Sequence, residues 1–101
     1  MDQLKWSDRE KKIAHSVFDA ALQQELAEVI AKFKAQVERV QTPDALWPLE
    51  DWLAKQRRHV DERYDFRYSQ LILVFASLLR EGRITRSQLD KLAFVDGLAS
   101  L

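Results

Sequence analysis

The sequence predicts an all-α protein made of a long antiparallel helical hairpin and a short C-terminal helix. The chain has 101 residues but only two glycines and two prolines, so it contains little material for the tight turns of a β architecture. Apolar residues recur three and four positions apart over two long stretches, as on the buried face of an amphipathic helix. Its length is typical of one domain, expected over 1–101.

The first helix is expected over about 7–41. Ser7 is a suitable N-cap, and Glu10 three residues later completes a capping box. The apolar stripe of this helix consists of Phe18, Leu22, Leu26, Val29, Phe33, Val37 and Val40. Thr42 and Pro43 then end it, with a short turn over 43–46.

The second helix is expected over about 48–81. It should begin at Pro48, because a proline deeper inside a helix clashes with the carbonyl four residues earlier. Gly82 supplies the residue that ends it. Thr85 and Gln88 form a second capping box, which predicts a short helix over about 86–94.

Each of the two long helices carries more apolar surface than the other helix can cover. The second would extend about 50 Å, given a rise of about 1.5 Å per residue, and the short connection makes the two antiparallel neighbours. Ile13, Val17 and Ile30 widen the first stripe, and Trp52 and Ile72 widen the second. We therefore expect a homodimer that forms an elongated helical bundle.

The middle of the second helix, residues 57–67, is polar where the stripe should be apolar. One interpretation is a solvated face with Arg57–Asp61 and Arg58–Glu62 pairs four residues apart, and periodicity favours it. The other is an interaction surface, because this stretch mixes arginines with aromatic residues that interfaces favour.

The sequence argues against an enzyme and against a metal site. His15 and His59 lie on different helices, and neither has a ligand partner at metal-binding spacing. Asp61, Glu62 and Asp65 lie among arginines, which favour permanent ionisation over proton transfer. No phosphate-binding glycine loop and no nucleophile with its base is visible, so we expect no cofactor.

Composition limits the partners and the compartment. The 16 basic and 16 acidic residues balance, which is not the pattern of a nucleic-acid binder. There is no cysteine, so disulfides and thiolate ligands are excluded. No signal peptide or membrane-spanning run is present, so we expect a cytoplasmic protein that does not insert into a membrane.

Several fixed spacings resemble the fluorescence recovery protein family. They are Leu46-Trp47-x-Leu49-Glu50-Asp51-x-Leu53, Arg57, Asp61, Tyr64-Asp65-x-Arg67-x-Ser69, Val74-Phe75 and Glu81-Gly82, with a weaker match at Ala14-His15-x-x-Phe18 and Glu25-Leu26. The resemblance implies a homodimeric, non-enzymatic regulator of cyanobacterial photoprotection. In that family the partner is the light-activated red form of the orange carotenoid protein, bound mainly through its C-terminal domain. The regulator speeds the return of this partner to the orange form. It thereby ends non-photochemical quenching at the phycobilisome, on the cytoplasmic face of thylakoids.

The resemblance also implies roles for particular residues. Trp47, Asp51 and Arg57 match positions that are important for function in that family. Leu46 matches a residue of the dimer contact, and we extend this expected contact to Leu49 and Leu53. Asp51 and Arg57 are expected to orient the partner or to hold the dimer, and both roles stay open. Two alternatives for the partner also remain: a related carotenoid-binding protein, or an unrelated partner of a homodimeric helical adaptor in a non-cyanobacterial bacterium.

Overall fold

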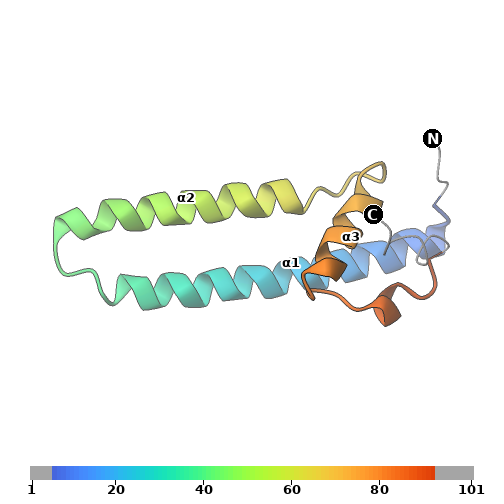
Figure 1. Cartoon of the computed structure of the whole chain (residues 1–101), viewed down its shortest axis with the longest axis horizontal. Coiled ribbons are helices and arrows are strands. Elements are labelled where there is room, and N and C mark those ends of the chain that lie inside the picture. The colour runs from blue at the N-terminus through green and yellow to red at the C-terminus, as the bar shows by residue number, and fades with distance from the viewer. Residues whose placement is uncertain (1–5, 93–101) are drawn as a thin grey trace. The chain divides into compact units, whose positions relative to one another are not determined.

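The fold, obtained as a computed structural model, is described for residues 6–92 and is helical without strands over that range. Three α-helices, α1 (Asp8–Val37), α2 (Leu46–Arg63) and α3 (Leu71–Arg80), are accompanied by two short 3-10 helices, η1 (Pro43–Ala45) and η2 (Arg86–Leu89) (Figure 1). The all-α prediction is confirmed.

The chain divides into two compact units. Unit 1 comprises 1–21 together with 64–101, and unit 2 comprises 22–63. Helix α1 contributes its first part to unit 1 and its second part to unit 2. Nearly all of the buried apolar core belongs to unit 1, whose largest fully buried side chains are Phe75, Leu71, Leu78, Leu89 and Leu92.

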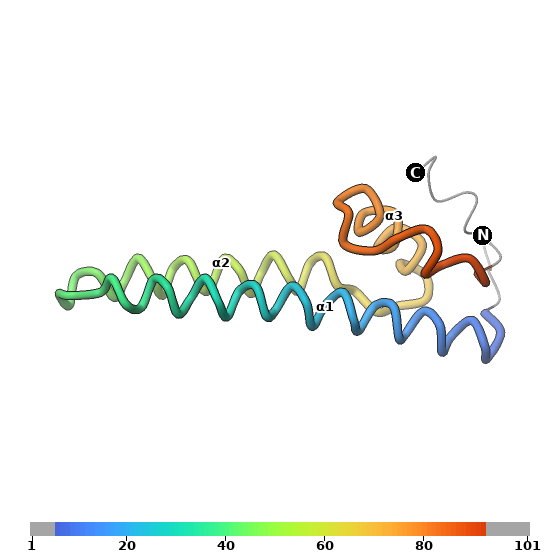
Figure 2. Tube along the Cα trace, turned by 90° about the horizontal axis from the view of Figure 1, so that it is seen from below, coloured from blue at the N-terminus to red at the C-terminus, as the bar shows by residue number. Residues whose placement is uncertain are grey.

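Unit 2 is the predicted antiparallel hairpin. The second part of α1 and the whole of α2 run side by side in opposite directions (Figures 1 and 2). The capping box that starts α1 is also confirmed: the Ser7 backbone N–H donates to Glu10 Oε1, and the Glu10 N–H donates to Ser7 Oγ, each at 3.1 Å. Helix α1 ends at Val37, earlier than expected, because Arg39 N–H and Val40 N–H bond three residues back and close a turn there.

Helix α2 begins at Leu46, two residues before the expected start at Pro48. Pro48 is the third residue of this helix, where a backbone N–H would have no partner within the helix, so the proline removes no hydrogen bond. The turn η1 precedes it, with Thr42 at its cap and Pro43 at its first position as expected. Trp47 therefore lies inside the first turn of α2 rather than before it.

The expectation of one continuous helix over 48–81 is wrong, because residues 64–70 separate α2 from α3. A continuous helix would place Asp65 over Asp61, and Arg67 over Arg63, and like charges four residues apart destabilise a helix. Aromatic residues in the segment also have low helix propensity. Local charge and propensity thus oppose the helix that the apolar spacing alone suggested.

Residues 64–68 instead place alternate side chains on one face, where three aromatic rings pack on α1 within unit 1. Tyr64 and Phe66 both meet Phe18 edge to face, with ring centroids 5.4 and 4.8 Å apart. Phe66 also lies edge to face on His15 at 5.1 Å, and the Tyr64 hydroxyl donates to the Ala21 carbonyl at 3.3 Å. These contacts replace the helical hydrogen bonds that the segment lacks.

Asp65 and Arg67 project between these aromatic positions and bind each other. The Arg67 Nε lies 2.9 Å from both carboxylate oxygens of Asp65. This hydrogen-bonded ion pair lowers the pKa of Asp65 and raises the pKa of Arg67. Residues two apart do not face each other in an α-helix, so the pair requires that the helix is interrupted here. The Asp65–Arg67 ion pair contributes its full stability at pH values above the ordinary carboxyl pKa. This contribution is lost as the pH falls through the lowered pKa of Asp65.

Gly82 ends α3 as expected. Its φ of +74° lies in the left-handed region that favours glycine. Gly82 N–H bonds to the Leu79 carbonyl at 3.1 Å, and Arg83 N–H bonds to the Leu78 carbonyl at 2.9 Å. These two bonds make a Schellman motif.

The expected short helix over 86–94 is a 3-10 helix over Arg86–Leu89, and positions 93 and 94 lie outside the described residues. The capping box at Thr85 and Gln88 is present, with Thr85 N–H donating to Gln88 Oε1 at 2.7 Å. Leu89 and Leu92, three residues apart, are both buried. Leu92 follows the 3-10 helix, and its N–H bonds to the Leu89 carbonyl at 2.9 Å in a further turn.

Candidate functional site

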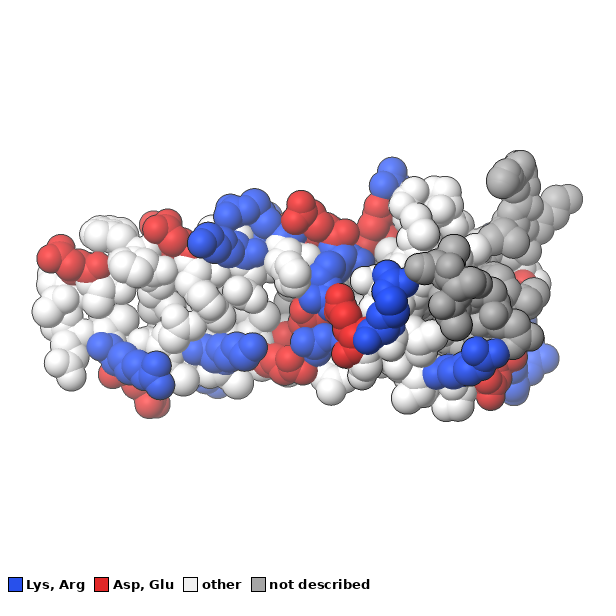
Figure 3. Space-filling model, viewed as in Figure 1, with Lys and Arg blue, Asp and Glu red and all other residues white. Residues whose placement is uncertain are grey.

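The hairpin of unit 2 buries few of its large apolar side chains. Among its residues only Leu49 and Val60 are buried apolar side chains. Five large apolar side chains of the hairpin are exposed. Their exposed fractions are 54% for Ile30, 45% for Val37, 46% for Leu46, 61% for Trp47 and 40% for Leu53. Exposed apolar surface of this kind marks interaction sites. Figure 3 shows an uncharged strip along the hairpin between charged residues at its two edges.

The predicted site residues all lie on α2 but differ in accessibility. Trp47, in the first turn of α2, is the most exposed large apolar residue of the described chain. Leu46 and Leu53 are exposed, as a contact with another chain requires. Leu49 is 8% exposed and packs inside the hairpin, so in this chain it supports the surface rather than forming it.

Asp51 and Arg57 are both exposed and do not bind each other. Six residues separate them on α2, which is a rotation of about 120° around the helix axis. Arg57 instead pairs with Asp61, with Nε 3.8 Å from the carboxylate oxygen and side chains 85% and 70% exposed. A pair this exposed contributes little stability, so Arg57 remains available to a partner. The other expected pair, Arg58 with Glu62, is not formed.

A groove lies between the two helices of the hairpin beside Arg57. It encloses about 190 Å³ and is lined by Leu26, Val29, Leu53, Gln56, Arg57, Val60 and Asp61. Its floor is aliphatic and its charged rim carries one arginine and one aspartate. An apolar pocket with charges at its edge is the arrangement in which interface hot spots concentrate binding energy.

A second groove lies at the turn of the hairpin, next in sequence to Trp47. It encloses about 210 Å³ and is lined by Gln36, Arg39, Val40, Ala45, Pro48 and Leu49. Pro48 and Leu49 follow Trp47 directly on α2, and Val40 adds apolar surface from the segment after α1. Together the two grooves and the exposed side chains listed above define what we name the hairpin surface.

An ion pair that the sequence did not indicate holds the other end of the hairpin. Arg63 Nη1 lies 3.2 Å from Glu25 Oε2, and their side chains are only 17% and 8% exposed. Glu25 belongs to the second part of α1, and Arg63 is the last residue of α2. No sequence spacing connects residues 38 positions apart on two helices. The only sign of this ion pair in the sequence is Glu25, an acidic residue on an otherwise apolar face of α1.

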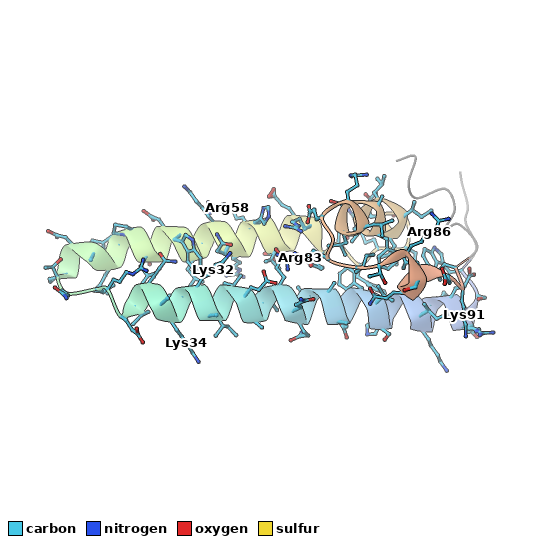
Figure 4. The ribbon with its side chains drawn as sticks, turned by 60° about the horizontal axis from the view of Figure 1, so that its bottom comes forward. Lys32, Lys34, Arg58, Arg83, Arg86 and Lys91 are labelled. Carbon is cyan, nitrogen blue, oxygen red and sulfur yellow. The ribbon has the colours of Figure 1, made fainter. Side chains whose placement is uncertain are left out.

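Basic side chains are spread over the described chain rather than gathered on one helix face. Figure 4 places Lys32 and Lys34 on α1, Arg58 on α2, and Arg86 and Lys91 after α3. Within residues 6–92, no group of three or more histidine, cysteine, aspartate or glutamate residues is arranged to hold a metal ion. No helix in this range combines the length and apolar character needed to cross a bilayer.

Comparison with known proteins adds a sequence match over nearly the whole chain. The family described as photoprotection regulator fluorescence recovery protein matches residues 6–99. The fluorescence recovery protein of Synechocystis sp. PCC 6803 is 41% identical over 88 residues, which cover 87% of this chain and 81% of that protein.

Solved structures agree with this match. The fluorescence recovery protein of Fremyella diplosiphon superposes with a TM-score of 0.80 at 28% identity. A single-substitution variant of the Synechocystis sp. PCC 6803 protein superposes with a TM-score of 0.83 at 37% identity. In both cases 96% of this chain and 100% of the other are covered. Since sequence and fold agree over this length, the chain belongs to the fluorescence recovery protein family of photoprotection regulators.

Proposed function

We propose that this chain is a homodimeric, non-enzymatic regulator that binds the light-activated red form of the orange carotenoid protein. The contact is made mainly to the C-terminal domain of that partner, and it accelerates return to the inactive orange form. Quenching at the phycobilisome ends as a result. Family membership supports this activity, and the exposed apolar side chains of the hairpin surface are suited to a contact with another protein.

The observation that carries the proposal is the small number of buried apolar side chains in unit 2. A hairpin with two buried apolar residues and five large exposed ones presents apolar surface that contact with another protein would remove from water. Leu46 and Leu53 suit the contact between copies. Trp47 offers an anchor for the carotenoid protein, while Asp51 and Arg57 select its orientation.

Regulation of this type needs no bond chemistry. A protein that binds one form of its partner better than another shifts the equilibrium between the forms by the difference in affinity. To accelerate the conversion as well, it must stabilise the transition state more than it stabilises the red form. Charged side chains at the rim of an apolar groove can supply such a difference, because their interaction energies depend strongly on the position of the partner.

Replacing Arg57 by leucine should slow recovery of the red carotenoid protein at least about tenfold, because loss of one charged interface contact typically costs 2 kcal/mol or more. The measurement is the red-to-orange absorbance change in darkness with the chain below stoichiometric amounts. Arg58→Leu is the matched control, since Arg58 is exposed on the same helix but does not line the groove. Light scattering on both variants establishes that the oligomer is unchanged.

Two outcomes would contradict the proposal. If the unmodified chain does not accelerate recovery, the adaptor function with an unrelated partner is correct instead. If Arg57→Leu retains full activity with an intact dimer, Arg57 does not belong to the partner-binding surface.

Replacing Leu46 by glutamate should convert the dimer to a helical monomer. Leu46 is 46% exposed on α2, and a charge at an apolar interface costs several kcal/mol. Light scattering at micromolar concentration measures the mass, and circular dichroism measures the helix content. Leu73→Glu is the control, because Leu73 is 55% exposed but belongs to unit 1. A monomeric mass for the unmodified chain would refute the dimer.

A further inference from the structure

One exposed face of α2 combines two leucines with two opposite charges. Leu46, Glu50, Leu53 and Arg57 follow one another at spacings of four, three and four residues, which places them in one stripe along the helix. All four are exposed. Glu50 makes no hydrogen bond or ion pair within residues 6–92, and Arg57 pairs there only with the exposed Asp61. The stripe therefore carries a carboxylate and a guanidinium that are both available to another chain.

The flank of α1 on the same side of the hairpin is apolar. The groove beside Arg57 opens on this side, since it is lined by Leu26 of α1 and by Leu53 of α2. Ile30 and Val37 follow Leu26 by four and eleven residues, which keeps them within about 40° of it around the axis of α1. Both are exposed. Both helices thus contribute exposed apolar residues to one face of the hairpin.

We propose that a second copy of this chain lies on this face with its α2 antiparallel to α2, so that its Glu50 binds Arg57 and its Leu46 enters the groove beside Arg57. This arrangement rests on the proposed function, of which the homodimer is a part, and it builds the surface around Arg57 from two chains. A two-fold axis that crosses α2 between residues 53 and 54 produces both contacts, because it exchanges position 50 with 57 and position 46 with 61. Since Asp61 lines the groove, Leu46 of the second copy arrives over its aliphatic floor.

Charge complementarity selects the antiparallel arrangement. If the same stripes met in parallel, Glu50 would lie beside Glu50 of the second copy and Arg57 beside Arg57, and like charges across a helix interface oppose such pairing. In the antiparallel arrangement each Arg57 meets a carboxylate, and the contact occurs twice because the interface is symmetric. A guanidinium has five donors, so Arg57 can bind Glu50 of the second copy without losing Asp61.

The exposed residues of α1 give an independent position for the axis. The ion pair between Glu25 and Arg63 fixes the register of the two antiparallel helices. When both helices are followed residue by residue from this pair, the midpoint of Ile30 and Val37 lies beside residues 54 and 55 of α2. The axis inferred from the charges is therefore within about one residue of the centre of the exposed apolar surface on α1.

Charge reversal tests the contact between Glu50 and Arg57. Glu50→Arg and Arg57→Glu each bring like charges together twice per dimer, so each should raise the dimer dissociation constant about tenfold or more at low salt. Combining the two changes restores opposite charges, and the constant should return to within about threefold of its original value. Sedimentation equilibrium gives the constants, and circular dichroism establishes that each variant is folded.

Glu62→Arg is the matched control for these variants. Glu62 is exposed on the opposite side of α2 from Leu53, nine residues and about 180° away around the axis. Glu62→Arg should leave the dissociation constant within about threefold of the original value, as for most exposed positions. Adding Arg57→Glu to it should give no rescue, because position 62 does not meet Arg57 of the second copy.

Disulfide trapping tests the position of the axis without changing any charge. The chain has no cysteine, so one introduced cysteine can bond only to the same residue of a second copy. Leu53→Cys lies next to the axis and should give a covalent dimer with oxidised glutathione. Leu46→Cys should stay unlinked, because the antiparallel arrangement separates its two copies by about 20 Å along the helices. Efficient linkage of Leu46→Cys would indicate parallel pairing and overturn the proposal.

The outcomes separate this arrangement from the proposed function. If the double variant dissociates as readily as the single variants, Glu50 does not bind Arg57 of the second copy, although the dimer and its effect on the carotenoid protein stand. A monomeric unmodified chain overturns the arrangement together with the homodimer. A dimer that shows the rescue but does not speed red-to-orange recovery supports the arrangement and overturns only the choice of partner.

Discussion

Replacing Phe75 by alanine is expected to lower the free energy of unfolding by about 3–5 kcal/mol, the range for deletion of a buried aromatic ring. Phe75 is 0% exposed and is the largest fully buried side chain of unit 1. Its removal leaves a cavity that the surrounding core fills only in part. Urea unfolding followed by circular dichroism measures the loss.

Leu73→Ala is the matched control for this prediction. Leu73 is on the same helix two residues earlier, but it is 55% exposed. Its replacement should cost about 0.5 kcal/mol or less, as for most surface positions. Equal losses in the two variants would mean that Phe75 does not organise the core of unit 1.

Replacing Glu25 by alanine should destabilise the protein by about 3 kcal/mol, because it leaves the Arg63 guanidinium in a largely buried site without this carboxylate. The two side chains are 8% and 17% exposed, so water replaces the lost partner poorly. Chemical unfolding again gives the value. The exposed Arg57–Asp61 pair provides the contrast, and Asp61→Asn should change stability by less than about 1 kcal/mol.

A double variant separates the ion pair from simple loss of packing. Replacing Arg63 by leucine together with Glu25→Ala removes both charges, and it should recover part of the stability that Glu25→Ala alone loses. If the effects of Glu25→Ala and Arg63→Leu on the free energy of unfolding simply add in the double variant, Glu25 does not act through Arg63.

The parts of the fold governed by local rules could be predicted from the sequence. Both capping boxes and the helix end at Gly82 follow from side chains within a few residues of one another. The antiparallel hairpin follows from the apolar spacing and the short connection. Apolar spacing alone does not predict the interruption after Arg63, because it carries no information on the like charges at positions 61 and 65 or on the alternation of Tyr64, Phe66 and Tyr68.

The candidate surface was predictable only in part. Trp47, Asp51 and Arg57 came from the resemblance to a family, and the structure adds that Asp51 and Arg57 are not paired with each other. The groove beside Arg57 combines residues from two helices, and sequence spacing says nothing about which of them meet. For the same reason, the sequence does not predict the contact of Glu25 with Arg63.

The alternation of side chains over residues 64–68 has a consequence for how this chain can vary. Tyr64 and Phe66 pack on α1, whereas Asp65 and Arg67, at the alternate positions, bind each other. Exchanging Asp65 and Arg67 for other polar residues would leave the rings in place. Inserting or deleting one residue would turn the rings outward and the charges inward. Within this family fold, the number of residues in the connection is therefore constrained more tightly than the identity of its charges.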